Sequence, residues 1–280
     1  MRARAAWLGA LGLLALMLAW GPTPVAAAGG RGAGPGLAPA GGFELGLAAG
    51  WLSRERFQDT SESFREADGS TGSEASTNLK IRNDRTYMIN LAYGLTRWLT
   101  LRAGLGMVEG GSLHETLGNG DWEAKLKSNF VWGLGARALV WQGPSGLGLS
   151  AGLDYLRYDD RGIKYWQYPT PGTGNTSDSG VNVDGRVDYW RVQGDVRLHW
   201  DLGRWRPFVG GAYAYSELKD EDRWSYPDGT WSKYDFSTKS EDRWGLLGGL
   251  EAELMPGLNL LVQGMLLARE EIGLSLSYDF

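Results

Sequence analysis

The sequence predicts an all-β protein: a closed antiparallel transmembrane β-barrel of about ten strands, with short periplasmic turns and long extracellular loops. Three patterns lead to this prediction. Apolar residues alternate with small or polar ones over successive segments, short connections alternate with long ones, and aromatic residues gather near the segment ends. A tilted strand needs ~9–11 residues to cross a bilayer, and the alternating segments have about this length.

The N-terminus has the pattern of a secretory signal peptide. Two arginines precede an apolar run over residues 5–20, and the small residues 26–28 supply a cleavage site. An uncleaved anchor is the alternative, but the run is short for a membrane-spanning helix. We therefore expect a signal peptide over residues 1–28, a flexible periplasmic leader rich in Gly, Ala and Pro over residues 29–41, and a barrel over residues 42–280.

Ten segments alternate with a period of two after the leader. In the first, Phe43, Leu45 and Leu47 lie on one face and Glu44 lies on the other. An even number of strands lets the first pair with the last, which leaves no sheet edge unpaired in lipid. The segments are 43–51, 87–95, 99–107, 130–140, 147–156, 190–200, 207–215, 244–254, 258–266 and 272–280.

Short and long connections alternate between these segments. A soluble β-sandwich would also alternate in hydrophobicity, but short turns opposite longer external loops are typical of transmembrane barrels. The turn signal at residues 227–230 (Pro-Asp-Gly-Thr) predicts a hairpin that rises beyond the membrane. The short connections are 94–97, 142–146, 201–204 and 255–257, and the long ones lie near 53–78, 109–127, 158–186 and 217–242.

The less apolar face carries Gly, Ala and a few charges of both signs. A lumen enclosed by about ten strands should be mostly filled by side chains, so we expect these charges to form ion pairs. If the arginines lined one water-filled wall instead, an anion-selective channel would be the better prediction. His199 also falls on this face, and we expect it to pair with Asp195 or Asp201. The predicted lumen ion pairs involve Glu44, Arg102, Arg137, Asp154, Arg191, Asp195, Arg197, Glu251 and Glu253.

The aromatic residues predict two girdles, because amphipathic rings favour the headgroup regions of a membrane. Ordinary packing in a soluble β-core is the alternative. One set lies beside the short connections: Phe43, Trp98, Trp141, Trp200, Trp205, Tyr278 and Phe280. The other lies nearer the long connections: Trp51, Tyr87, Phe130, Tyr155, Trp190, Tyr213 and Trp244.

The last segment carries the most specific pattern. Ile272, Leu274, Leu276, Tyr278 and Phe280 share one face, and Phe280 is the last residue. This pattern resembles the C-terminal assembly signal of bacterial outer-membrane proteins, with Tyr278 and Phe280 as its aromatic residues. The resemblance implies a Gram-negative outer-membrane barrel with both termini in the periplasm. It also implies contact with membrane lipid and lipopolysaccharide, and insertion by the barrel-assembly machinery.

The composition excludes several kinds of site. The chain has no cysteine and two histidines, so it lacks a disulfide framework and a thiolate metal site, and we expect neither metal nor cofactor. The absence of a G-x-S-x-G motif leaves few nucleophile–base combinations. The net charge of −5 argues against nucleic acid as a partner.

Two short motifs are similar to those of the omptins, ten-stranded outer-membrane proteases. The omptin D-x-D-W element has a counterpart in the second long connection, N-G-D-W from Asn119, and the D-x-H element has one in D-E-D at residues 220–222. One omptin Asp is therefore Asn119, and the essential His is Asp222, so the general base would be missing. We expect no catalytic residues; the alternative is a hydrolytic set of Asp121, Asp220, Asp222 and His114 at the extracellular mouth.

Two classes of function remain open. The favoured one is a non-enzymatic surface barrel that is structural, adhesive, ligand-binding or a narrow conduit, and the other is an omptin-like hydrolase. The connections 158–186 and 217–242 are rich in aromatic residues, which can bind an extracellular ligand or stiffen the loops by packing together. Convergence of the four alternative residues on one water-sized site would favour the hydrolase.

Overall fold

The computed structural model describes residues 36–118, 120–168 and 174–280. The predicted signal peptide, the first part of the predicted leader (29–35) and Asn119 lie outside these residues. The described chain forms β-strands and their connections, and it contains no helix that is long and apolar enough to span a membrane.

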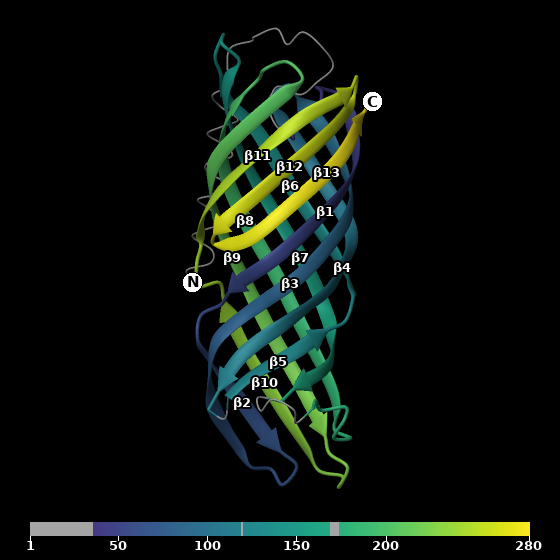
Figure 1. Ribbon diagram of the computed structural model, residues 1–280, viewed down its shortest axis with the longest axis vertical. Helices are drawn as coiled ribbons and strands as arrows, with labels where there is room; N and C mark the ends of the chain where they lie inside the picture. The colour runs from purple at the N-terminus through teal and green to yellow at the C-terminus, as the bar shows by residue number, and fades with distance from the viewer. Residues whose placement is uncertain (1–35, 119, 169–173) are drawn as a thin grey trace.

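Ten strands form a closed antiparallel ring (Figure 1). β1 pairs with β13, with Glu44 opposite Asp279, so the first and last strands close the barrel as predicted. Each predicted segment falls in one of these strands, apart from Phe280 at the end. The ring comprises β1 (Phe43–Arg56), β3 (Thr71–Thr96), β4 (Leu99–Leu117), β6 (Asn129–Gln142), β7 (Leu147–Gln167), β8 (Asn182–Trp200), β9 (Trp205–Ser225), β11 (Trp244–Met255), β12 (Leu258–Leu267) and β13 (Arg269–Asp279).

Four tight turns lie at one end of the ring, which we call the short-turn end. They join β3 to β4, β6 to β7, β8 to β9 and β11 to β12, as the sequence predicts. Gly146, Gly203 and Gly257 have positive φ angles of 80°, 79° and 81° in these turns, a conformation that glycine adopts without strain. The chain also ends here, where the Phe43 N–H donates to the Phe280 carbonyl at 2.9 Å.

Three further strands build a second ring at the opposite end (Figure 1). They are β2 (Thr60–Glu66), β5 (Gly120–Leu126) and β10 (Trp231–Lys239). β5 lies between β4 and β7, while β10 and β2 connect β9 to β3. With β3, β4, β7, β8 and β9 they close a ring of eight strands, which we call the extension. The long connections predicted from the sequence are therefore mostly strand, and residues 227–230 form the predicted hairpin turn between β9 and β10.

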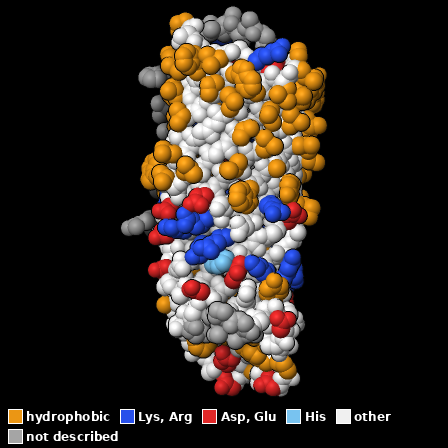
Figure 2. Space-filling view, viewed as in Figure 1, with side chains coloured by type: hydrophobic (Ala, Val, Ile, Leu, Met, Phe, Trp, Pro, Cys, Tyr) orange, Lys and Arg blue, Asp and Glu red, His pale blue; other side chains and the backbone are white. Residues whose placement is uncertain are grey.

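The two rings differ in their outer surfaces. Apolar side chains cover the outside of the ten-stranded ring, as Leu47 and Leu105 show by exposures of 63% and 59%. Charged side chains prevail on the extension (Figure 2). Exposed aromatic residues edge the apolar belt: Phe43, Trp141, Trp200, Trp205, Tyr278 and Phe280 at the short-turn end, and Trp51, Tyr87, Phe130, Tyr213 and Trp244 towards the extension. An apolar surface of this extent is not stable in water.

The interiors of the two rings also differ in polarity, and the difference is the reverse of that on the outer surfaces. A hydrophobic core fills the barrel between the lumen of the ten-stranded ring and the open end of the extension. It includes Leu79, Ile81, Leu113, Ile163 and Leu218, all at most 1% exposed. The lumen of the ten-stranded ring instead holds buried charges of both signs, among them Arg137, Asp195 and Arg197. The barrel next to the extension therefore has an apolar core, as a soluble protein does, whereas the ten-stranded ring has a charged lumen.

Candidate functional site

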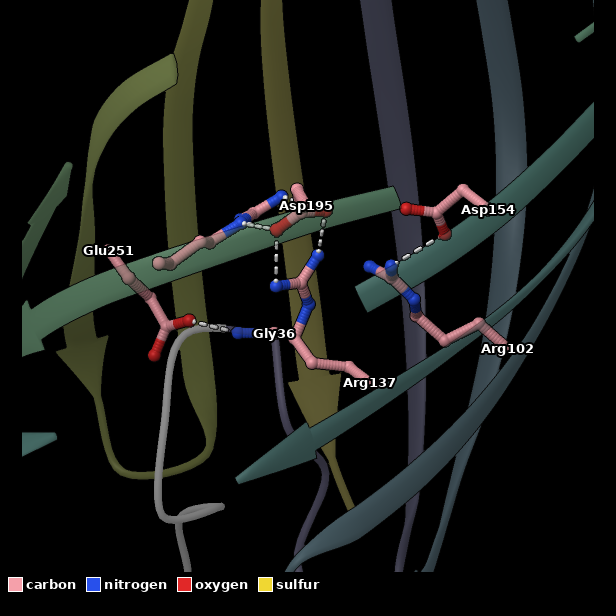
Figure 3. A network of polar contacts seen from close by, with 7 residues as sticks. Gly36, Arg102, Arg137, Asp154, Asp195 and Glu251 are labelled. Atoms are coloured by element: carbon pink, nitrogen blue, oxygen red, sulfur yellow. Dashed lines mark hydrogen bonds and ion pairs between the residues drawn. The ribbon is translucent and has the colours of Figure 1, made fainter. Parts of the chain in front are cut away.

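An arginine–carboxylate network crosses the lumen of the ten-stranded ring (Figure 3). Arg137 on β6 donates from Nη1 and Nη2 to the two oxygens of Asp195 on β8, at 3.0 and 2.9 Å. Arg197 Nε donates to Asp195 Oδ1 at 2.6 Å. The side chains of Arg137 and Asp195 are fully buried. This bidentate geometry is the strongest form of the pair, and it fixes β6 against β8.

The other predicted lumen charges lie around this network. Arg102 Nη2 donates to Asp154 Oδ1 at 2.7 Å. Arg191 contacts a carboxylate outside the predicted set, Glu271, with Nη1 3.5 Å from Oε2. Glu44 faces Asp279 across the β1–β13 seam. Among the described contacts, three of the nine predicted residues therefore depart from the expected arginine–carboxylate pairs: Glu44, Arg191 and Glu251.

Glu251 and Glu253 lie nearer the short-turn end. Arg206 Nη1 donates to Glu251 Oε1 at 2.7 Å, and the Gly257 N–H donates to Glu253 Oε1 at 3.4 Å. Arg206 is absent from the predicted set because it directly precedes the predicted segment 207–215, although its spacing from inward Phe208 places it on the lumen face. Asp201 is 3.5 Å from Arg206.

His199 is 1% exposed and packs over Gly148, where an added Cβ would lie 2.4 Å from Nε2. The two carboxylates predicted to pair with His199 contact arginines: Asp195 contacts Arg137 and Arg197, and Asp201 contacts Arg206. The histidine is thus a buried residue of the short-turn end, on the face that the sequence predicts.

The end of the predicted leader lies inside the short-turn end of the lumen. The Gly36 N–H donates to Glu251 Oε2 at 2.7 Å, and the Ala38 N–H donates to Thr100 Oγ1 at 3.0 Å. Leu37 and Ala38 are 5% and 1% exposed. Residues 36–41 are therefore held in place rather than free, and they cover the network on this side.

A second polar layer separates the lumen from the hydrophobic core. Arg161 Nη1 donates to Asp84 Oδ2 at 2.9 Å and Nη2 donates to the Gly110 carbonyl at 2.6 Å. Across the barrel, Glu55 accepts from Tyr189 Oη at 3.0 Å. This layer was not predicted, because Arg161 and Glu55 lie in segments expected to be loops and Asp84 lies just outside a predicted strand.

Four carboxyl groups converge inside the extension. Glu62 on β2, Glu115 on β4, and Asp220 and Asp222 on β9 are at most 5% exposed. Asp222 accepts from the indole nitrogens of Trp166 and Trp224, and Glu115 accepts from Ser76 Oγ at 2.7 Å. Among the described residues, no Lys or Arg forms an ion pair with any of the four. We call them the carboxyl cluster.

Burial without a cation changes the acidity of this cluster. Burial and repulsion from Glu115 and Asp222 raise the pKa of Glu62 to about 9. Burial raises the pKa of Glu115 to about 7 and that of Asp222 to about 6. The pKa of Asp220 is raised well above its ordinary value by burial and by its neighbour Asp222. The cluster therefore retains protons at neutral pH.

Aromatic rings pack over the carboxyl cluster. Trp122 lies 5.7 Å from Trp224 and 5.5 Å from Tyr168 between ring centroids. Trp224 lies 5.6 Å from Tyr234. The aromatic residues of the predicted loops thus contact one another, which agrees with the interpretation that they stiffen this region.

The residues of the hydrolytic alternative do not meet. Asp220 and Asp222 point into the extension, whereas His114 contacts Glu123 on the outer face, with Nε2 3.2 Å from Oε1. Asp121 is exposed and accepts from Thr116 Oγ1 at 2.5 Å. His114 and inward Glu115 are adjacent in β4, and successive side chains of a strand point to opposite faces. In the described part of the chain, no group of three or more His, Cys, Asp or Glu side chains is arranged to hold a metal ion.

No protein-family model and no curated protein matches the chain. Solved structures do. The outer membrane protease OmpT from Escherichia coli is 14% identical, with 85% of this chain and 97% of that chain covered and a TM-score of 0.50. The outer membrane protein OprG from Pseudomonas aeruginosa is 12% identical, with 86% and 96% covered and a TM-score of 0.43. The likeness to OmpT shows the fold, that of a bacterial outer-membrane β-barrel.

Proposed function

We propose that this chain is a non-enzymatic outer-membrane barrel with a closed lumen, which holds the extension on the cell surface as a structural or adhesive contact surface. The observation that carries the proposal is the double closure of the interior. The Arg137–Asp195 network and the leader close the short-turn end, and the hydrophobic core closes the other end.

The outer surface supports the membrane placement. Its apolar belt, edged by aromatic residues, matches the lipid-facing surface of a transmembrane barrel. Short turns typically face the periplasm, so the extension would face outward. Just beyond the belt, Arg54 and Arg56 on β1 lie opposite Arg82 and Lys80 on β3. Like charges directly opposite each other are destabilising, and anionic groups of lipopolysaccharide would relieve the repulsion.

The closed interior argues against a conduit. The arginines Arg102, Arg137 and Arg197 are within 3.0 Å of carboxylates instead of lining one continuous wall. Beyond them the path meets packed side chains such as Leu79 and Ile163. An ion would have to leave water and cross an apolar core, and the free energy of this transfer is too high for conduction.

The geometry of the alternative residues argues against hydrolysis. A general base must lie within hydrogen-bond reach of the attacking water. His114 is on the opposite side of the barrel wall from Asp220 and Asp222, and the aromatic rings of Trp122, Trp166 and Trp224 pack together within the same extension.

Planar-bilayer conductance and peptide cleavage, measured side by side on the purified full-length protein, test the proposal. We expect neither stable conductance steps nor cleavage of a peptide library. Reproducible conductance would overturn the closed lumen. Cleavage that disappears in an Asp222→Asn variant would overturn the non-enzymatic assignment and favour a hydrolase.

A further inference from the structure

Arg191 differs from the other three predicted lumen arginines. Its one ion pair among the described residues is the 3.5 Å contact with Glu271 Oε2, and that oxygen lies closer to Arg269 Nε, at 2.8 Å. The side chain of Arg191 is 11% exposed. A guanidinium has five N–H donors, so most of the binding capacity of Arg191 is not used by the described protein groups.

Arg191 lines a cavity of about 290 Å³ inside the ten-stranded ring. Four amide side chains share this cavity: Gln193 beside Arg191 on β8, Asn90 on β3, and Asn259 and Gln263 on β12. The cavity thus offers a guanidinium and amides as hydrogen-bonding groups. Its apolar lining includes Met88, Val131, Leu156, Leu247, Leu261 and Met265.

The strands around Arg191 carry an excess of positive charge. Arg102, Arg137, Arg191 and Arg197 project from β4, β6 and β8, and the carboxylates among them are Asp154 and Asp195. Of the remaining acidic residues of the cavity, Asp84 and Glu251 form ion pairs with Arg161 and Arg206. Glu44 and Asp279 lie opposite each other at the short-turn end, away from Glu271. A ligand at Arg191 should therefore be an anion.

The wall around the cavity is lowest on the side of the extension. Glu271, which contacts Arg191, is 27% exposed. The β12–β13 hairpin ends nearby, at residues 267–269, whereas β7, β8 and β9 continue into the extension. Residues 36–41 cover the other end. The cavity is therefore a blind pocket and not a passage.

We propose that this pocket binds a small aliphatic carboxylate, with the carboxylate group on Arg191 and the hydrocarbon chain against Leu156 and Met88. The planar fork of a guanidinium matches a carboxylate in a bidentate arrangement. Leu156 lies directly opposite Arg191 in the β7–β8 pairing, so an apolar wall adjoins the charged group. This inference is separate from the proposed function, because it concerns the lumen and needs neither the extension's surface role nor the absence of catalysis.

Isothermal titration calorimetry of the purified full-length protein in detergent, with sodium hexanoate as the probe, tests the pocket. We expect saturable binding of hexanoate, weaker binding of acetate, which lacks the chain, and no binding of hexylammonium, which reverses the charge. Arg191→Gln should weaken hexanoate binding at least about tenfold, the loss expected for one charge-assisted contact. Arg186→Gln, on the same strand but 61% exposed, should not change it.

A second pair of variants leaves Arg191 intact. An added Cβ at Gly273 would contact Gln263 Cγ at an ordinary 3.4 Å, so Gly273→Val fits the wall and occupies the cavity. Gly248→Val makes the same change at a position paired with lipid-facing Val209. Hexanoate binding should weaken in the first variant and not in the second. Absence of saturable binding, equal affinity for acetate and hexanoate, or equal effects of the two valine variants would overturn the pocket.

Discussion

At the scale of single residues, Asp195 determines how the lumen tolerates charge. It accepts hydrogen bonds from Arg137 on β6 and from Arg197 on its own strand. A buried carboxylate is tolerated when its partners and hydrogen bonds are in place, and it becomes costly when one of them is removed. Asp195 therefore joins two strands as well as balancing charge.

Arg137→Ala should lower the free energy of unfolding by about 3–5 kcal/mol, because it leaves a fully buried carboxylate with one cation less. The free energy of unfolding is measured by titration with urea, with the folded and unfolded fractions separated by their different migration in a gel when the samples are not heated. Arg157→Ala is the control: its pair with Asp159 is exposed, so the loss should stay under about 1 kcal/mol. Equal losses in the two variants would contradict a structural role for the network.

The carboxyl cluster should make the extension less stable as pH rises. A carboxyl group whose pKa is raised on folding stabilises the protein fully below its unfolded pKa, and this contribution is lost as pH rises towards the folded value. For Glu62 the interval runs from its ordinary value of 4.5 to about 9. Tryptophan fluorescence and hydrogen exchange in the extension should report loosening between these limits.

Glu62→Gln keeps the shape of the side chain and removes its charge, so it should flatten this pH dependence. Glu221→Gln, on the outward face of β9, should leave it unchanged. An extension that becomes more stable from pH 5 to 9, or a Glu62→Gln variant that follows the native profile, would show that the cluster does not retain its protons.

At the scale of elements, the ten ring strands were predictable because lipid on one side and a small-residue lumen on the other impose a strict alternation. β2 was missed because charged Glu62 and apolar Phe64 share its inward side, which obscures the alternation in Thr60–Glu66. β5 does alternate, with Ala124 and Leu126 inward, but seven residues within a polar segment give a weak signal.

The candidate site was less predictable than the strands. Asp220 and Asp222 were expected in the long connection 217–242, but they belong to β9, where a spacing of two puts both on its inward face. His114 and Asp121 were assigned to a loop, where no face is defined. Only the pairing of β4 with β5 shows that both lie outside.

The leader depends on close contact with β3. The Gly41 N–H donates to the Gly94 carbonyl at 2.7 Å, and a Cβ at Gly94 would lie 2.0 Å from the Pro39 carbonyl oxygen. Gly94→Val should therefore displace residues 36–41 and increase their cleavage by a soluble protease. Gly248→Val, where an added Cβ meets open space apart from one ordinary contact, should not. Equal cleavage in the two variants would contradict the contact.

At the scale of the whole molecule, the two stacked rings have inverted polarity. The ten-stranded ring is apolar outside and charged inside, and the extension is charged outside with an apolar core below its mouth. A change of surroundings from lipid to water along one continuous wall accounts for this inversion, because strands such as β9 pass through both rings. The two interiors then act as independent closures in series.

Independent closures predict that opening the short-turn end should expose that side of the pocket without creating a channel. The chain has no cysteine, so a single Ser277→Cys at the lumenal, short-turn side of the cavity can report access. Deleting residues 36–41 should speed its labelling by a bulky maleimide, while Ser145→Cys in an exposed turn labels rapidly with or without the deletion. Bilayer conductance should stay absent, since the hydrophobic core is unchanged. An unchanged labelling rate would show that the leader does not close the lumen, and steady conductance after the deletion would show that the core does not.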